Sequence, residues 1–172
     1  MIECVYLIGC RAVGKSSIGV KLAQKLGYEF LDTDSLVTEK LGCSVAESVR
    51  REGWQKFRDL EKEVLLQLTK RSSCVVATGG GAILHRGVWP QLKQQGWVVW
   101  LTADLKILCE RLTADQNSET LRPSLTGKDV CQELEDVLAE RNPLYRATAD
   151  CIIDSGTLTI TEAVNHIEKY LM

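Results

Sequence analysis

Residues 9–16 carry the side-chain spacing with the clearest chemistry. They read Gly-Cys-Arg-Ala-Val-Gly-Lys-Ser, which matches G-x-x-x-x-G-K-[ST], and they follow the apolar run Cys4–Ile8 directly. Glycines let the backbone curl with its amide hydrogens pointing inward, and Lys15 adds a positive charge near the β- and γ-oxygens of a nucleoside triphosphate. Ser16 offers a hydroxyl to Mg²⁺ at the start of a helix whose dipole also favours the anion. The segment therefore predicts triphosphate binding; a glycine turn that merely joins a strand to a helix is the alternative.

Two carboxylates, Asp32 and Asp34, follow the apolar run Tyr28–Leu31. If strand 4–8 neighbours both this run and the run 74–78 in the sheet, Asp32 lies close enough to reach Mg²⁺ through water, while Asp34 points farther out toward an acceptor. Phosphoryl transfer needs this division, with one acid for the metal and one that orients or deprotonates the attacking hydroxyl. Run Cys74–Thr78 lacks the terminal aspartate of many P-loop ATPases, which strengthens the case for Asp32. Asp34 as the cap of the next helix is an alternative that remains compatible with catalysis.

Candidate acceptor-binding groups lie farther along the chain. Gly79, Gly80 and Gly81 follow the run 74–78 and predict free amide hydrogens where a bulky side chain would block a ligand, although a flexible turn has the same composition. Arg58 lies three residues before Glu61 on an expected helix, so the glutamate can hold the guanidinium while its remaining donors face a carboxylate.

A second arginine, Arg141, follows Leu134 and Leu138 at helical spacing and so lies along a buried stripe, where it needs a partner. Each arginine alone is more often solvated or salt-bridged than a ligand. Together, in a mildly acidic chain, they suggest an anionic substrate.

Apolar runs alternate with helix-period stretches along the whole chain, which predicts a three-layer α/β/α fold around a parallel sheet. The expected strands are Cys4–Ile8, Tyr28–Leu31, Cys74–Thr78, Trp97–Leu101 and Cys151–Ile153. The expected helices are Ser16–Leu26, Asp34–Leu41, Val45–Arg51, Trp54–Lys70, Val88–Gln95, Ala103–Leu112, Val130–Arg141 and Thr159–Leu171. Ligands bind such sheets beyond the carboxyl ends of the strands, where the candidate residues lie. The polar interval Ala114–Thr120 is the best candidate for a mobile segment, although an ordinary surface loop would look the same.

Composition limits the classes of function. The chain has 172 residues, 45% of them hydrophobic, and no repeat or linker, which predicts one domain over residues 1–172. Lys and Arg (21) nearly balance Asp and Glu (23), so no broad surface for nucleic acid or anionic membrane is expected. No stretch of eighteen apolar residues and no leader pattern occurs, so we expect a soluble, unprocessed, monomeric protein.

The seven cysteines favour a reducing cytoplasm. Their number is odd and no C-x-x-C occurs, so those in apolar runs, including Cys4, Cys74, Cys109 and Cys151, are interpreted as small buried thiols. Neither histidine is near a cysteine in the sequence. A structural zinc site or a disulfide framework is therefore not expected.

The ordered set of motifs resembles the shikimate kinase family. The matching segments are residues 9–16, Phe-Leu-Asp-Thr-Asp at 30–34, Phe57-Arg58 with Glu61, Ala-Thr-Gly-Gly-Gly at 77–81, Leu-Arg-Pro at 121–123 and Arg-Asn-Pro-Leu-Tyr at 141–145. The resemblance spans nearly the whole chain. It implies a nucleoside-monophosphate-kinase-like fold, a five-stranded parallel sheet of order 2-3-1-4-5 with a mobile lid at about 113–126, and transfer of the γ-phosphoryl of ATP to the 3-hydroxyl of shikimate in chorismate biosynthesis.

The same resemblance implies a role for each matching residue. The phosphate-binding loop would comprise Ala12, Val13, Gly14, Lys15, Ser16 and Ser17, with Ser16 and Asp32 for Mg²⁺. Asp34 would bind the ring hydroxyls, Arg58 and Arg141 the carboxylate, and Gly79, Gly80 and Gly81 would supply amide contacts. Arg111 would lie against adenine, and Arg122 on the lid would join Lys15 and Asp34 in catalysis.

Three positions depart from the family pattern. Ala12 replaces a frequent glycine, Ser17 replaces a frequent threonine, and Val49 stands where several members have an aromatic residue. These departures bear on affinity rather than reaction type. Other small-metabolite kinases, such as a gluconate or nucleoside-monophosphate kinase, are the nearest alternatives; a nucleotide-dependent switch or a catalytically silent regulatory domain is the alternative from another class.

Overall fold

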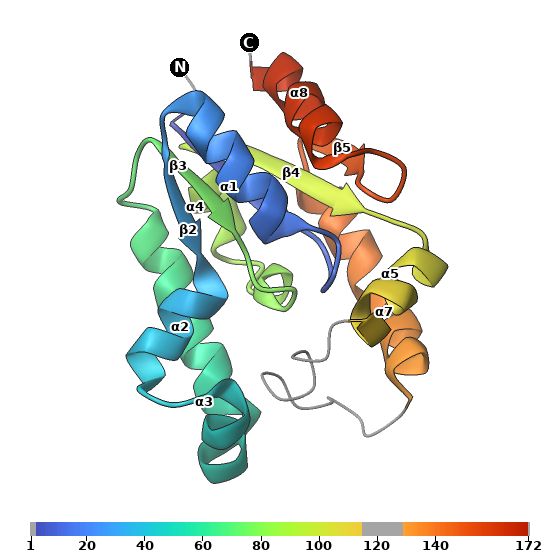
Figure 1. Ribbon diagram of the computed structural model, residues 1–172. Coiled ribbons are helices and arrows are strands. Elements are labelled where there is room, and N and C mark those ends of the chain that lie inside the picture. The colour runs from blue at the N-terminus through green and yellow to red at the C-terminus, as the bar shows by residue number, and fades with distance from the viewer. Residues whose placement is uncertain (1–2, 115–128, 172) are drawn as a thin grey trace.

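A five-stranded parallel sheet in the order β2-β3-β1-β4-β5 forms the centre of the fold in the computed structural model, which describes residues 3–114 and 129–171 (Figure 1). Its strands are β1 (Cys4–Ile8), β2 (Glu29–Asp32), β3 (Cys74–Ala77), β4 (Gly96–Thr102) and β5 (Cys151–Asp154). The central strand β1 is buried at every position, as expected for a strand with helices on both faces. The expected fold class and strand order are confirmed.

Helices cover both faces of this sheet (Figure 1). They are α1 (Lys15–Leu26), α2 (Thr33–Leu41), α3 (Val45–Leu68), the 3-10 turn η1 (Ala82–Leu84), α4 (Trp89–Lys93), α5 (Leu105–Ala114), α7 (Val130–Thr148) and α8 (Ile160–Leu171). Alternate residues of β1 belong to different cores, because successive side chains of a strand point to opposite faces. Val5 and Leu7 pack with α1, α5 and α8, whereas Tyr6 and Ile8 pack with α3, α4 and η1.

Two helices differ from expectation in instructive ways. Helix α3 contains the expected break, because Gly53 takes φ 79° and ψ 171° between the two predicted helices. Helix α7 was expected to end at Arg141, but it continues through Pro143 to Thr148. Pro143 is exposed, so the carbonyl that loses its helical donor lies on the solvent side of the helix, where water can satisfy it.

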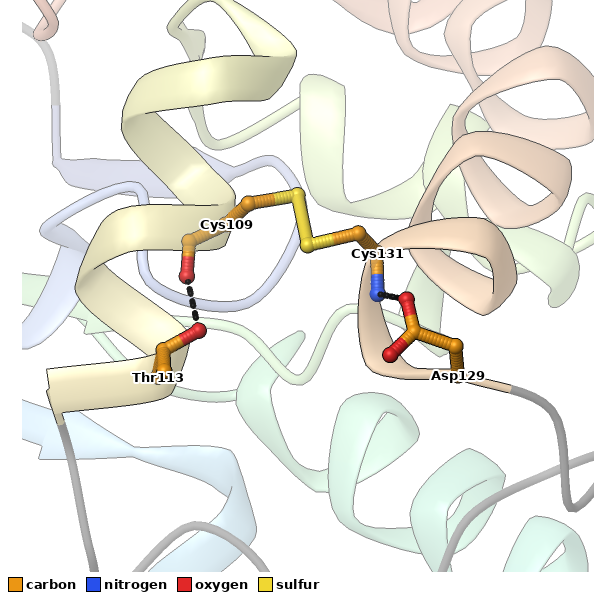
Figure 2. The surroundings of a disulfide bond; sticks show 4 residues. All are labelled: Cys109, Thr113, Asp129 and Cys131. Carbon is orange, nitrogen blue, oxygen red and sulfur yellow. Dashed lines mark hydrogen bonds between the residues drawn. A yellow bond between two sulfur atoms is a disulfide. The ribbon is translucent and has the colours of Figure 1, made fainter.

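The expectation of thiols throughout is wrong at Cys109, which forms a disulfide with Cys131 (Figure 2). The bond joins the middle of α5 to the first turn of α7, and the Cα atoms of Cys109 and Cys131 are 5.5 Å apart. Figure 2 also shows that Asp129 accepts a hydrogen bond from the Cys131 N–H at 3.1 Å and thereby caps α7. The packing of α5 against α7 brings the two sulfurs together although 22 positions separate them.

The other five cysteines are free. Cys4, Cys74 and Cys151 are buried as expected, and Cys10 is buried as well. Among the described helices none is both long and apolar enough to cross a bilayer.

Candidate functional site

The loop between β1 and α1 curls around the ammonium group of Lys15. Lys15 Nζ donates to the carbonyl oxygens of Gly9 at 2.9 Å and Cys10 at 2.6 Å. Gly14, immediately before α1, has φ 94°, and Ala12 has φ 60°, so both lie in the left-handed region. No side chain caps α1, which leaves its first backbone N–H groups to an outside acceptor. This geometry can receive a phosphate group.

Two residues from the second half of the chain support the outer side of this loop. Arg111 on α5 donates to the carbonyl oxygens of Ala12 and Ser155, each at 3.1 Å. The Ser155 hydroxyl, after β5, donates to Val13 O at 2.6 Å. The loop conformation is therefore held from α5 and from the end of β5. The expected place of Arg111 against adenine stays a prediction.

Asp32 and Ser16 meet at the other side of the loop. The Ser16 hydroxyl donates to Asp32 Oδ2 at 2.9 Å. Asp32 Oδ1 accepts the N–H groups of Asp34 at 2.9 Å and Ser35 at 3.4 Å, so Asp32, and not Asp34, caps α2. Strand β3 lies between β1 and β2, as in the expected order 2-3-1-4-5, so Asp32 does not depend on β1 and β2 being direct neighbours. Asp32 nevertheless reaches the loop, since it stands at the carboxyl end of its strand.

The pair fits a Mg²⁺ ion that is shared with phosphate. Magnesium prefers oxygen ligands and keeps several waters, and one hydroxyl with one carboxylate is a typical protein contribution beside phosphate oxygens. Over residues 3–114 and 129–171, no group of three or more His, Cys, Asp or Glu side chains gathers into a cage of its own.

A cavity opens beside the loop and brings together residues from six parts of the chain. They come from the loop itself, from the starts of α2 and α3, from α3 beyond its break, from the triple glycine and from α7. Its lining consists of Cys10, Arg11, Asp34, Val45, Trp54, Phe57, Arg58, Glu61, Gly80, Gly81, Leu134, Val137 and Arg141. Both predicted arginines and the predicted second aspartate therefore face one space.

On α3, Arg58 is fixed as its spacing to Glu61 predicts. Arg58 Nη1 donates to Glu61 Oε2 at 2.6 Å, and the Glu61 residue is only 1% exposed. The guanidinium carbon lies 5.6 Å from the centre of the Trp54 ring and 5.3 Å from that of Phe57. The same carboxylate oxygen of Glu61 also contacts His85 Nε2 at 2.9 Å. Arg58 is thus held by an acid and by aromatic side chains while it lines the cavity.

Arg141 enters the cavity from α7 and is 7% exposed. Its Nε is buried without a hydrogen-bond partner among the described residues. The sequence predicted that an arginine on this buried stripe would need a partner, and this nitrogen is free to bind one. One turn later, the Tyr145 hydroxyl donates to Gly80 O at 2.7 Å. Burial raises the pKa of Tyr145 and keeps it a neutral donor. Burial likewise raises the pKa of the Cys10 thiol, which stays protonated beside the loop.

The triple glycine makes room for charged side chains. A Cβ at Gly79 would lie 2.7 Å from Asp34 Oδ1, and a Cβ at Gly81 would overlap the Arg58 guanidinium. The Gly79 N–H donates to Thr33 Oγ1 at 2.8 Å, so it is not available to a ligand in this arrangement. Gly80 and Gly81, but not Gly79, line the cavity. Of the three amides expected to bind a ligand, those of Gly80 and Gly81 remain candidates.

Several residues that shape the site were missed from the sequence. Trp54 was placed only as the start of a helix, and Ser155, Tyr145 and His85 were given no role in the site. Of these, only Tyr145 carried a signal, because it belongs to the Arg-Asn-Pro-Leu-Tyr segment. In addition, Arg11 Nη2 lies 3.6 Å from the buried carboxylate of Glu133 on α7. Val49, which stands where several family members have an aromatic residue against the ring, packs against the small α2–α3 core, two members of which, Val45 and Phe57, line the cavity.

Part of the expected site lies outside the described residues. Arg122 and most of the expected lid at 113–126 fall in the interval 115–128. Thr113 and Ala114, counted with that lid, are the last residues of α5.

Comparison with known proteins gives a consistent result. The family described as shikimate kinase matches residues 11–172. Shikimate kinase 2 of Yersinia enterocolitica is 44% identical over 155 residues, which cover 90% of this chain and 88% of that protein. The shikimate kinase of Nitratidesulfovibrio vulgaris is 43% identical over 162 residues, or 93% and 92% of the two chains.

Solved structures agree with the sequence comparisons. Shikimate kinase from Acinetobacter baumannii, solved in complex with shikimate, has a TM-score of 0.90 at 35% identity and covers 99% of this chain and 93% of its own. The enzyme from Bacteroides thetaiotaomicron has a TM-score of 0.86 at 26% identity, with 98% of both chains covered. The chain described here belongs to the shikimate kinase family.

Proposed function

We propose that this protein catalyses the ATP-dependent phosphorylation of the 3-hydroxyl of shikimate, giving shikimate 3-phosphate and ADP in aromatic amino-acid biosynthesis. One observation carries the proposal: the phosphate-binding loop, an aspartate and two arginines line a single cavity. Family membership supports it, as does the shikimate bound in the structure of the Acinetobacter baumannii relative.

On the nucleotide side, the amides of residues 12–17 would bind the phosphates, and Arg111 would lie against adenine. Lys15 would exchange its carbonyl contacts for phosphate oxygens. Ser16 and Asp32 would hold Mg²⁺, which neutralises charge on the phosphates when bound. Because the loop is held from outside by Arg111 and Ser155, its amides are organised before the nucleotide arrives.

On the acceptor side, Arg58 and Arg141 would bind the carboxylate of shikimate, and Gly80 and Gly81 would supply backbone contacts. Asp34 would align the acceptor hydroxyl and accept its proton as the oxygen attacks the γ-phosphorus in line. The transferring phosphoryl would then lie between Lys15 and Asp34. The expected role of Arg122 in offsetting its charge stays a prediction.

We further propose a single-domain monomer that acts in the cytoplasm, with ATP and shikimate as its small-molecule partners and with neither nucleic acid nor membrane among them. The near balance of 21 basic and 23 acidic residues supports the absence of nucleic acid and membrane from its partners.

The proposed function is tested by coupled ADP release with shikimate, gluconate, AMP or no acceptor, each with MgATP. We expect turnover with shikimate only, and product that carries the phosphate on the 3-oxygen by NMR. Lys15→Ala, purified identically, controls for contaminating kinases and should be nearly inactive. Turnover with gluconate or AMP but not shikimate would instead assign another small-metabolite kinase, and release without an acceptor would assign a nucleotidase.

A further inference from the structure

A histidine outside the cavity shares the carboxylate that fixes the cavity's first arginine. Glu61 Oε2 accepts from Arg58 Nη1 at 2.6 Å and lies 2.9 Å from His85 Nε2. The side chains of Glu61 and His85 are 2% and 11% exposed, so water contributes little to screening this contact. One oxygen thus links a substrate-facing cation to a titratable ring.

The backbone holds His85 firmly in this position. His85 follows η1, and its N–H donates to Ala82 O at 3.2 Å, while the Leu84 N–H donates to Gly81 O at 3.0 Å. Gly81 in turn lies against the Arg58 guanidinium. The Glu61–His85 contact therefore ties α3 to the segment that carries two backbone groups of the cavity.

Charge at this point depends on the histidine. Histidine changes charge between pH 5 and 8, unlike the other ordinary side chains. With a neutral His85 that donates from Nε2, the Arg58–Glu61–His85 group carries no net charge; with a doubly protonated ring it carries one positive charge. The second proton, on Nδ1, would give the ring a full positive charge beside Glu61 and leave more of the Arg58 charge to an anionic ligand.

Other charged groups near Arg58, Glu61 and His85, which we call the triad, come from the neighbouring elements. Asp34 on α2 lies against Gly79, as does Glu61 Oε1. Arg141 on α7 approaches Gly80, and Arg86 follows His85 on the exposed side of the turn. Among these groups the histidine is the one whose charge ordinarily changes near neutral pH, so it sets how the local net charge varies with pH.

We propose that His85 is a positioning residue for the acceptor carboxylate, setting through Glu61 the orientation and effective charge of Arg58, so that shikimate binding tightens as His85 gains its second proton. The proposal rests on the proposed function, because it names the group that binds the acid. It assigns no role to His85 in phosphoryl transfer itself.

The first test compares acceptor KM and kcat from pH 5.5 to 8.5, at saturating MgATP, in wild type, His85→Gln and His166→Gln. The chain has two histidines, and His166 is exposed on α8, so the second variant is a matched control. We expect KM for shikimate in wild type and His166→Gln to rise about fivefold from low to high pH, near the lower end of typical coupling between sites. In His85→Gln, KM should vary little with pH, whereas kcat should follow the wild-type profile.

A second measurement needs no variant at the triad. Because binding and protonation are reciprocally linked, shikimate should move the titration midpoint of the His85 imidazole proton resonance to higher pH and leave that of His166 unchanged. The His166→Gln spectrum assigns the two resonances. An unchanged His85 midpoint, a KM that rises toward low pH, or wild-type pH dependence in His85→Gln would overturn the proposal. Failure of wild type to phosphorylate shikimate at any pH would instead overturn the proposed function.

Discussion

Ser16 and Asp32 are joined by a 2.9 Å hydrogen bond through one oxygen of the carboxylate, while the other oxygen caps α2. The effect of the negative charge of Asp32 can therefore be measured separately from the effect of its capping of α2, by two different substitutions. Asparagine caps helices as well as aspartate does, whereas alanine does not cap them. Asp32→Asn should preserve folding and lose the negative charge that favours the metal.

We expect Asp32→Asn to raise the Mg²⁺ concentration for half-maximal activity about tenfold, as for other outer ligands of a metal, with an unchanged free energy of unfolding. Asp32→Ala should in addition lose about 1 kcal/mol of stability. Mg²⁺ titration of activity and urea unfolding measure the two effects. Asp129→Asn, at the cap of α7, is the matched control; equal Mg²⁺ dependence in both asparagine variants would refute the metal role.

Asp34 lines the cavity beside Gly79, where an added Cβ would lie 2.7 Å from its Oδ1, and it does not cap α2, so it is assigned to the acceptor hydroxyl. Asp34→Asn should lower kcat by about 10²- to 10⁴-fold, the range of general base contributions. Steady-state kinetics at saturating shikimate and MgATP measure this loss. Asp59→Asn, an exposed carboxylate on α3, should retain wild-type kcat. Near-normal turnover of Asp34→Asn would remove its assigned role.

Tyr145 supports the triple glycine by donating to Gly80 O at 2.7 Å. Tyr145→Phe should lower the free energy of unfolding by about 1 kcal/mol at neutral pH, the usual contribution of one hydrogen bond. Burial raises the folded-state pKa of Tyr145 above its unfolded value of about 10, so this contribution is complete below pH 10 and declines as pH rises further. The difference between wild type and variant should therefore shrink above pH 10.

Urea unfolding at pH 7 and pH 10.5 measures this effect, with Tyr170→Phe as the control because Tyr170 is 51% exposed. A deficit that grows with pH would contradict the assignment.

The sequence was most informative where a short local pattern is compatible with a single local structure. The loop at 9–16 and the pairing of Arg58 with Glu61 follow from short spacings, and the apolar runs mark all five strands. The strand order came from family resemblance, because periodicity does not tell which strands are neighbours. Asp32 could be expected near the metal, but its capping of α2 depends on where that helix begins.

Contacts between segments far apart in the sequence could not be predicted from such local patterns. His85 meets Glu61 across 24 positions, and the contact depends on how η1 packs against α3. The Cys109–Cys131 bond similarly depends on the packing of α5 against α7. Helix α7 runs past its expected end at Arg141, because the exposed position of Pro143 lets the helix continue.

Ala12 offers a test of a family departure, because its φ of 60° is unfavourable for a residue with a Cβ. Ala12→Gly should raise the free energy of unfolding by about 0.5–1 kcal/mol, since release of that strain exceeds the extra entropy of glycine in the unfolded chain. Ala139→Gly, at an exposed position in the interior of α7, should instead lower it by about 1 kcal/mol. Urea unfolding of both variants measures the opposite signs; destabilisation by both would contradict the left-handed conformation of Ala12.

The Cys109–Cys131 disulfide closes a loop over a sequence separation of 22, for which chain entropy predicts about 3 kcal/mol of stabilisation. The oxidised protein, denatured without reductant, should present five of its seven cysteines to a thiol reagent, and all seven after reduction. Reduction should lower the unfolding midpoint in wild type and have no effect in the Cys109→Ser/Cys131→Ser variant. Cys43→Ser, which removes a half-buried free thiol, should respond to reductant as wild type does. Seven reactive thiols in the protein purified under oxidising conditions would show that the bond does not form.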